Sequence, residues 1–251
     1  MNFKLIIILL FSSLLFACQE EKPWTENHSE GKYIPVDSIS IAYQDSSTLA
    51  MIAPYKKKLD LDMDSVVAFS NKEYFKKKPN GSLNNLICDM VFDVIVKRYK
   101  KSEFKPDFCL LNYGGLRQPL PKGEITKSNI FQLMPFQNES VICRLSGKEM
   151  NKLFEYLLKS GGQPIANIKV YYKDDKFKNA EIGGKSFDST HSYNVLTSDY
   201  SAKGGDHMDF FLQADTMILC GSLLRNDIFT YIHGIKDGKL IANEEKRIFF
   251  E

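Results

Sequence analysis

The chain has 251 residues, and its 33 Lys and Arg against 31 Asp and Glu give a formal net charge of +2. Hydrophobic residues make up 43% and aromatic residues 12% of the sequence, a composition that excludes a largely disordered chain. The lysine runs at Lys56–Lys58 and Lys76–Lys78 are interpreted as solvated helix faces. We therefore expect no nucleic-acid partner.

The first residues form a targeting segment. Lys4 precedes an apolar stretch, residues 5–16, that is too short to span a bilayer, and a small residue then precedes Cys18. This order is typical of a bacterial lipobox. It predicts a lipoprotein signal peptide over residues 1–17, cleavage before Cys18, and lipidation of the Cys18 thiol as a membrane anchor. Residues 19–22 resemble an export tag of surface lipoproteins, so periplasmic and cell-surface placement both stay open.

Residues 18–47 are polar and are interpreted as a lipidated tether that runs into a strand near 33–43. Apolar periodicity and turn residues give the remaining elements. In chain order, the predicted helices are 49–59, 83–97, 126–133, 146–160 and 223–235, and the predicted strands are 65–70, 108–112, 140–145, 168–172, 178–182, 193–197 and 247–250. Helices and strands interleave without a regular βαβ rhythm, which favours an α/β fold with mixed sheets.

Cysteine and histidine spacing argues against disulfide and metal sites. Four cysteines lie within apolar runs and show no CxxC spacing, which favours buried thiols: Cys88, Cys109, Cys143 and Cys220. Four histidines are dispersed, without the i, i+4 spacing of a zinc site: His28, His191, His207 and His233. We expect no cofactor or metal in this chain.

Three polar segments follow predicted strands or turns. Residues 112–117 (NYGGLR) place Asn112 and Arg117 around two glycines, which allow close backbone approach. Residues 135–138 (PFQN) add an aromatic ring, and residues 200–207 (YSAKGGDH) add a tyrosine and a carboxylate. Taken singly, each segment also fits a tight turn or a core aromatic. Taken together, two aromatic rings, a carboxylate for a ribose diol and an arginine for phosphate predict a nucleotide pocket.

These segments occur in one order with several others, and here the chain resembles a known family. Further matching segments are residues 82–89 (SLNNLICD), 123–126 (GEIT), 145–149 (LSGKE) and 166–168 (ANI). The stretch from about residue 49 to residue 251 resembles the C-terminal domain of the 5′-nucleotidase family, which includes periplasmic UDP-sugar hydrolases and ecto-5′-nucleotidases. The resemblance implies one domain over residues 48–251, a layered α/β/β/α sandwich with mixed sheets.

The resemblance also implies substrate-binding positions. They are Asn112, Gly115, Arg117, Phe136, Asn138, Asn167, Tyr200, Gly204, Gly205 and Asp206. Phe136 and Tyr200 would sandwich the base, and Asp206 and Arg117 would reach the ribose and the phosphate side. Asn112 and Asn138 would contact base or sugar, and Asn167 would lie beside the base.

Three positions depart from the family pattern. Tyr200 stands where the family usually has Phe, and His207 stands where it usually has Gly. Only Lys76–Lys78 are available where the family usually has an arginine before its helix signature. A lysine is a flexible point charge, so we expect weaker phosphate binding there.

The family's dinuclear metal centre and catalytic Asp/His pair belong to a separate calcineurin-like domain with DxH, GD and GNH[DE] motifs. No DxH occurs here, and residues 27–30 (NHSE) lack the required glycine and strand. We therefore expect no catalytic residue in this chain. The leading hypothesis is the nucleotide-recognition subunit of a split 5′-nucleotidase, with divalent metals in a calcineurin-like metallophosphoesterase partner. Alternatives are a binding-only lipoprotein that captures nucleosides and a degenerate structural or interaction lipoprotein.

Overall fold

The computed structural model describes residues 29–35 and 45–251. Residues 52–251 form one compact unit, and residues 29–35, in the preceding unit, contain no helix or strand. The predicted strand near 33–43 is absent at 33–35, and the rest of it lies outside the described residues. The predicted signal peptide and Cys18 also lie outside them. Within the described part of the chain, no helix is long and apolar enough to cross a membrane.

The elements of the described residues follow in chain order. The helices are α2 (Ser46–Met63), α3 (Ser82–Arg98), α4 (Lys127–Leu133), α5 (Gly147–Lys159), α6 (Asp199–Ala202) and α7 (Leu224–Gly234), with 3₁₀ turns at Tyr113–Gly115, Gly205–His207 and Asp209–Gln213. The strands are β1 (Val66–Ser70), β2 (Phe108–Leu110), β3 (Gly123–Thr126), β4 (Glu139–Leu145), β5 (Ile165–Ala166), β6 (Ile168–Lys173), β7 (Lys176–Ile182), β8 (Lys185–Ser186), β9 (Tyr193–Ser198), β10 (Thr216–Leu223), β11 (Lys239–Leu240) and β12 (Ile248–Phe250).

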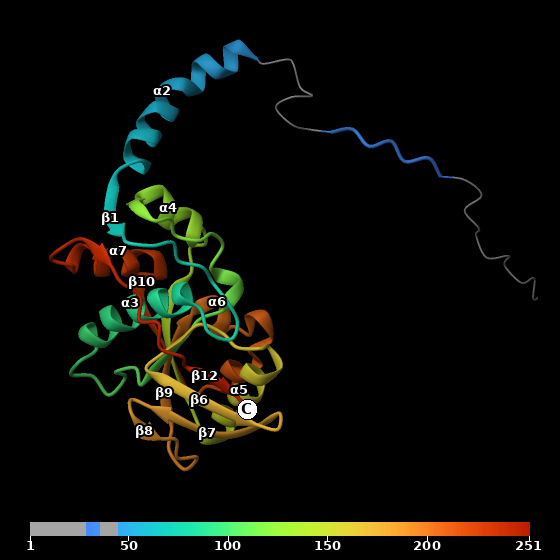
Figure 1. The fold of residues 1–251 in the computed structure, drawn as a ribbon, viewed down its shortest axis with the longest axis vertical. Helices are drawn as coiled ribbons and strands as arrows, with labels where there is room; N and C mark the ends of the chain where they lie inside the picture. Colours follow the sequence, from blue (N-terminus) through green and yellow to red (C-terminus); the bar gives the residue numbers. More distant parts are fainter. Residues whose placement is uncertain (1–28, 36–44) are drawn as a thin grey trace, which may run out of the picture. The chain divides into compact units, whose positions relative to one another are not determined.

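A five-stranded sheet in the order β10-β4-β9-β2-β5 lies at the centre of the unit (Figure 1). Only the β2–β9 pairing is parallel, and the other pairings in this sheet are antiparallel. A four-stranded sheet, β12-β6-β7-β8, and a three-stranded sheet, β11-β1-β3, each combine parallel and antiparallel pairs. The predicted α/β fold with mixed sheets is therefore confirmed.

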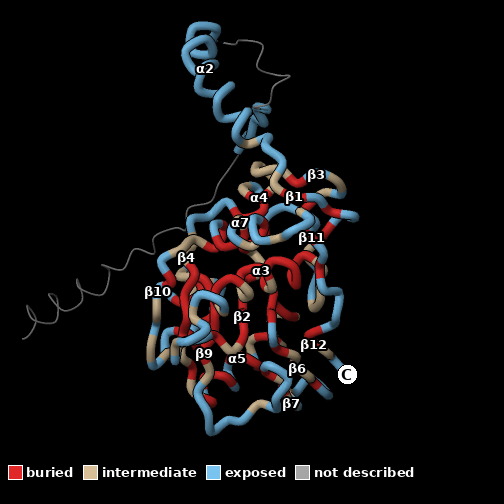
Figure 2. Tube along the Cα trace, turned by 90° about the vertical axis from the view of Figure 1, so that its left-hand side faces the viewer, coloured by how far each residue is buried: buried red, intermediate tan, exposed pale blue. Residues whose placement is uncertain are grey.

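The alternation of side chains along the central strands divides the core into two clusters. Figure 2 shows that buried residues follow β2, β4 and α3. In β4, Val141 and Cys143 point to one cluster and Ile142 points to the other. The Ile142 cluster includes side chains of α3 and α7, and the Val141 cluster includes side chains of α5, β6 and β7. The strands β2 and β9, from which the site loops leave, also contribute side chains to both clusters.

Five edge strands are absent from the sequence predictions: β3, β5, β8, β10 and β11. The segment 216–223 forms β10, an edge strand of the central sheet, where the sequence pattern predicts no strand. Its exposed positions include the apolar residues Met217 and Leu219, so its sequence does not alternate between apolar and polar residues. The short strand β3 is also absent from the predicted elements, because Thr126 is both its last residue and the N-cap of α4.

The cysteine prediction is confirmed for the described residues. Four cysteines are free and buried: Cys88, Cys109, Cys143 and Cys220. Burial raises the pKa of the Cys143 thiol to about 12 and that of Cys220 to about 11, so both stay protonated at neutral pH.

Candidate functional site

The first site loop leaves β2 and turns at the glycines that the sequence singled out. Asn112 is buried, and its side-chain amide donates a 2.9 Å hydrogen bond to the carboxylate of Asp206. A Cβ atom on Gly115 would lie 2.8 Å from the Asn112 amide oxygen, and one on Gly114 would lie 3.4 Å from the Asp206 carboxylate. Gly115 is therefore required for Asn112 to keep this position.

Arg117 lies at the end of the same loop with an exposed side chain. Its guanidinium carbon is 5.9 Å from the ring centroid of Phe136, which places the cation over an aromatic face. The Lys76 ammonium donates a 2.6 Å hydrogen bond to the Leu116 carbonyl. Burial lowers the pKa of Lys76, and the positive charge of Arg117 lowers it further. Two cations thus lie together at one end of the loop.

Phe136 lies in the connection between α4 and β4. Its ring is 48% exposed, a large fraction for a phenylalanine, and no core cluster includes it. Asn138 follows in the same connection, and its carbonyl accepts a 2.9 Å hydrogen bond from the Leu224 amide at the start of α7. The connection is anchored at its end, and the Phe136 ring is left facing solvent.

The second site loop follows β9 and the short helix α6. Ser198 caps α6 by accepting a 3.0 Å hydrogen bond from the Ser201 amide. The Tyr200 hydroxyl donates to the Asp206 carboxylate at 2.8 Å and accepts from the Asp206 amide at 3.2 Å. A Cβ atom on Gly205 would lie 2.5 Å from carbons of the Tyr200 ring, so only glycine fits beneath that ring.

The two loops and the Phe136 connection meet at one cavity of about 320 Å³. Its walls come from six predicted positions together with Gly114: Asn112, Arg117, Phe136, Asn138, Tyr200 and Asp206. The three predicted glycines do not line this cavity. Gly115 and Gly205 leave room for the side chains of Asn112 and Tyr200, and Gly204 lines an adjoining cavity.

Asn167 is not brought to this cavity. It has a left-handed backbone with φ 59°, and its side-chain amide donates a 2.7 Å hydrogen bond to the Asp107 carbonyl. It lines a separate cavity of about 380 Å³ with Asp89 and Arg247. The family pattern predicts Asn167 beside the base, whereas in the structure its side chain bonds the backbone of Asp107, 60 positions earlier in the chain.

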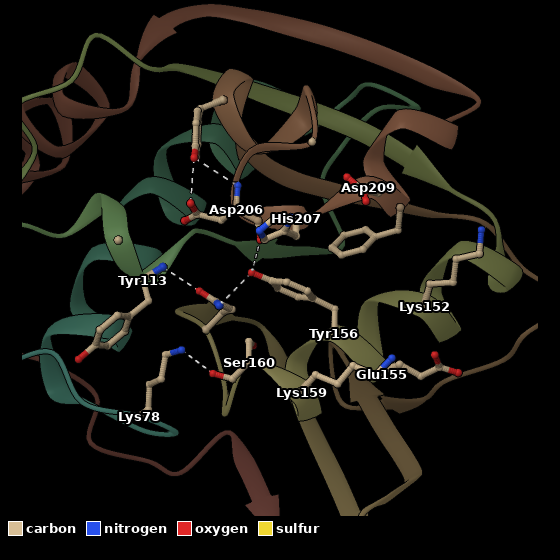
Figure 3. A pocket seen from close by; sticks show the side chains of 15 residues that line it. Lys78, Tyr113, Lys152, Glu155, Tyr156, Lys159, Ser160, Asp206, His207 and Asp209 are labelled. Atoms are coloured by element: carbon tan, nitrogen blue, oxygen red, sulfur yellow. Dashed lines mark hydrogen bonds between the residues drawn. The ribbon is translucent and has the colours of Figure 1, made fainter. Parts of the chain in front are cut away.

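A larger cavity of about 960 Å³ adjoins the first and shares Gly114, Tyr200 and Asp206 with it (Figure 3). Its other walls include three lysines and several aromatic residues: Lys78, Lys152, Lys159, Tyr113, Tyr156 and Phe210. The Lys78 ammonium donates a hydrogen bond to the Ser160 carbonyl, whereas Lys76 bonds the Leu116 carbonyl beside Arg117. Tyr156 and Gln163 line this cavity and are not among the predicted positions, because their spacing is that of ordinary helix and turn residues.

No group of three or more His, Cys, Asp or Glu side chains within the described residues could hold a metal ion. What the first cavity offers is two exposed aromatic rings, a carboxylate bonded to Asn112 and Tyr200, and an exposed guanidinium. Such a set can stack on a planar ring, accept hydrogen bonds from a diol and pair with an anion.

The sequence is similar to those of known proteins. The family model of the 5′-nucleotidase C-terminal domain matches residues 64–213. The chain is 32% identical over 108 residues to Protein UshA of Escherichia coli, a match that covers 40% of this chain and 19% of that protein. It is 25% identical over 172 residues to a 5′-nucleotidase of Vibrio vulnificus, covering 65% of this chain and 30% of that enzyme.

The fold is also similar to that of solved structures. The structure of a 5′-nucleotidase precursor from Thermus thermophilus matches with a TM-score of 0.68 and 20% identity, over 82% of this chain and 43% of that one. The chain therefore spans less than half the length of the relatives it matches.

Proposed function

Since the chain belongs to the family of 5′-nucleotidase C-terminal domains, we propose that it is the nucleotide-recognition subunit of a split 5′-nucleotidase. The observation that carries this proposal is the meeting of Phe136, Tyr200, Asp206 and Arg117 at one cavity. These residues come from three separate segments, and together they would supply two stacking surfaces for a base, an acceptor for a ribose diol and a cation for phosphate.

The proposed binding mode follows from the chemistry of each group. The base stacks between the Phe136 and Tyr200 rings, an interaction worth about 1–3 kcal/mol per aromatic residue. The ribose diol donates hydrogen bonds to Asp206, whose carboxylate oxygens retain acceptor capacity beyond their bonds to Tyr200 and Asn112. Arg117 pairs with the phosphate side, supported by the charge of Lys76.

The catalytic groups are proposed to reside on another chain. A calcineurin-like metallophosphoesterase would supply divalent metals, the nucleophilic water and the leaving-group acid. This chain would contribute binding energy that orients the phosphoester toward those metals. We further propose that lipidated Cys18 tethers it to a membrane, on the periplasmic or the outer face.

A reconstitution assay tests the proposal. The full-length chain, purified in mild detergent, is assayed with AMP and a divalent metal, alone and mixed with a calcineurin-like chain encoded beside it. Hydrolysis only in the mixture supports the split enzyme. Hydrolysis by this chain alone contradicts the assignment of catalysis to a partner. Nucleoside binding without hydrolysis in either sample favours the binding-only lipoprotein, and absence of binding favours the degenerate one.

A further inference from the structure

A tyrosine outside the predicted site contacts the backbone of Asp206. Tyr156 lies near the end of α5, a helix that contributes no wall to the smaller cavity. Its hydroxyl donates a 3.0 Å hydrogen bond to the Asp206 carbonyl, and Figure 3 shows it pointing from α5 toward the Asp206 loop. The contact joins residues 50 positions apart.

Gln163 continues this contact to the other site loop. Its side chain is 5% exposed, and its amide nitrogen donates a 3.1 Å hydrogen bond to the Tyr156 hydroxyl. Its amide oxygen accepts a 2.7 Å hydrogen bond from the Tyr113 backbone amide. One continuous row of hydrogen bonds therefore runs from the loop after β2, through Gln163 and Tyr156, to Asp206.

The backbone at the far end of this row is strained. Asp206 and His207 have φ values of 53° and 62°, and two consecutive non-glycine residues in the left-handed region are costly. Both backbone polar groups of Asp206 are bonded by tyrosines: its amide donates to Tyr200 and its carbonyl accepts from Tyr156. Loss of the Tyr156 bond would free the Asp206 carbonyl, so that the loop could relax and turn the carboxylate.

We propose that Tyr156 and Gln163 are positioning residues, which hold Asp206 in the backbone conformation that directs its carboxylate at the ribose diol. The inference rests on the proposed function, since both residues would hold in position a side chain of that same nucleoside site. Neither residue lines the smaller cavity, so they act on that cavity through Asp206.

Two further observations support the role. Burial, followed by the nearby Asp206 carboxylate and Tyr200, raises the pKa of Tyr156 to about 12, so its hydroxyl stays a donor at every physiological pH. The Tyr156 ring also packs 5.6 Å from the Phe210 ring, which fixes the direction of the hydroxyl. The donor is thus held in place before any ligand arrives.

The test compares a ligand with the diol to one without it. Binding of adenosine and of 2′,3′-dideoxyadenosine to the full-length chain is measured by calorimetry for wild type, Tyr156→Phe and Gln163→Met. Since a lost hydrogen bond weakens an interaction by roughly two- to tenfold, both variants should lose that factor for adenosine and change little for the dideoxy compound. A merely structural role would weaken both ligands equally.

The matched control is Tyr172→Phe. The Tyr172 hydroxyl also donates to a backbone carbonyl, that of Phe154 at 2.7 Å, but lies away from both cavities. This variant should lower the melting temperature and leave the ratio of the two affinities unchanged. Hydrogen exchange at the Asp206 and His207 amides gives a readout without ligand: Tyr156→Phe should accelerate it and Tyr172→Phe should not.

The outcomes separate the two proposals. If wild type binds adenosine and Tyr156→Phe changes neither the affinity ratio nor the exchange rates of these amides, the positioning role is wrong and the nucleoside site stands. If wild type binds neither compound, the proposed function is overturned together with the role assigned here to Tyr156.

Discussion

The hydroxyl of Tyr200 and the carboxylate of Asp206 are joined by a 2.8 Å hydrogen bond. This bond, followed by the negative charge of Asp206, raises the pKa of Tyr200. Tyr200 thus serves both as an aromatic wall of the cavity and as a partner of the carboxylate proposed to bind ribose. A phenylalanine at this position could do only the first.

Tyr200→Phe separates these two contributions. The ring remains, and Asp206 keeps its bonds to Asn112 and Tyr156, so adenosine affinity should stay within about threefold of wild type. Tyr200→Ala should weaken binding by at least about fivefold, because it removes a stacking surface. Calorimetric titration checks both. Equal affinity of the alanine variant and wild type would contradict stacking on Tyr200.

Phe136→Ala should abolish the opposite stacking surface without harming the fold. The ring is 48% exposed and belongs to no core cluster, so the melting temperature should stay close to that of wild type. Adenosine affinity should fall by at least about fivefold. Phe75→Ala is the control, since Phe75 is 55% exposed and lines neither cavity. A loss of affinity in the control as large as in Phe136→Ala would argue against a specific site.

Arg117→Ala should weaken the binding of a nucleotide more than the binding of the corresponding nucleoside. Because Arg117 is proposed to pair with the phosphate side, AMP affinity should fall by about tenfold and adenosine affinity should change much less. Arg117→Lys keeps the charge but loses the planar fork, so it should recover only part of the AMP affinity. The measurement is calorimetry with both ligands at fixed ionic strength. A parallel loss for AMP and adenosine would place Arg117 at the base or sugar.

His207→Gly should stabilise the fold. His207 has φ 62°, which glycine adopts without the steric cost of a side chain, so the free energy of unfolding should rise by about 0.5–1 kcal/mol. Lys203→Gly is the control, because the φ of Lys203 is −91° and glycine there should lower stability by a similar amount. Urea denaturation measures both. A destabilised His207→Gly variant would mean that the histidine side chain makes compensating contacts.

Stability should fall in alkaline solution through Cys143. Its pKa is raised from 9.0 to about 12 in the folded chain, first by burial and then by Cys220. The folded state therefore holds this proton more tightly, and the associated stability, complete below about pH 9, is lost as pH rises toward about 12. Between about pH 8 and pH 10 the loss is about 1 kcal/mol. Urea denaturation of Cys143→Ala should show that its free energy of unfolding falls less over this pH range than that of wild type, by the same amount. An equal fall in both proteins would assign the loss of stability to other groups.

Much of the fold can be read from local pattern. Periodicity locates α3, α5 and α7 and most strands, and Ser146, the first residue of the predicted helix 146–160, is the N-cap of α5. The edge strand β10 escapes prediction because its exposed positions Met217 and Leu219 are apolar, so the apolar–polar alternation that marks a strand is absent. Its existence depends on pairing with β4, a partner that lies far away in the sequence.

For the site, the chain itself determined which chemical groups are available, and the fold decided which of them meet. Phe136, Tyr200, Asp206 and Arg117 are recognisable because their segments have distinctive composition. The hydrogen bond between Asn112 and Asp206 spans 94 positions, and only the pairing of β2 with β9 brings these loops together. Tyr156 carries no sequence signal, since its role arises from packing of α5 against the Asp206 loop. Local sequence fixes local conformation and chemistry, whereas contacts between distant residues depend on tertiary packing, which placed Tyr156 at Asp206 and Asn167 elsewhere.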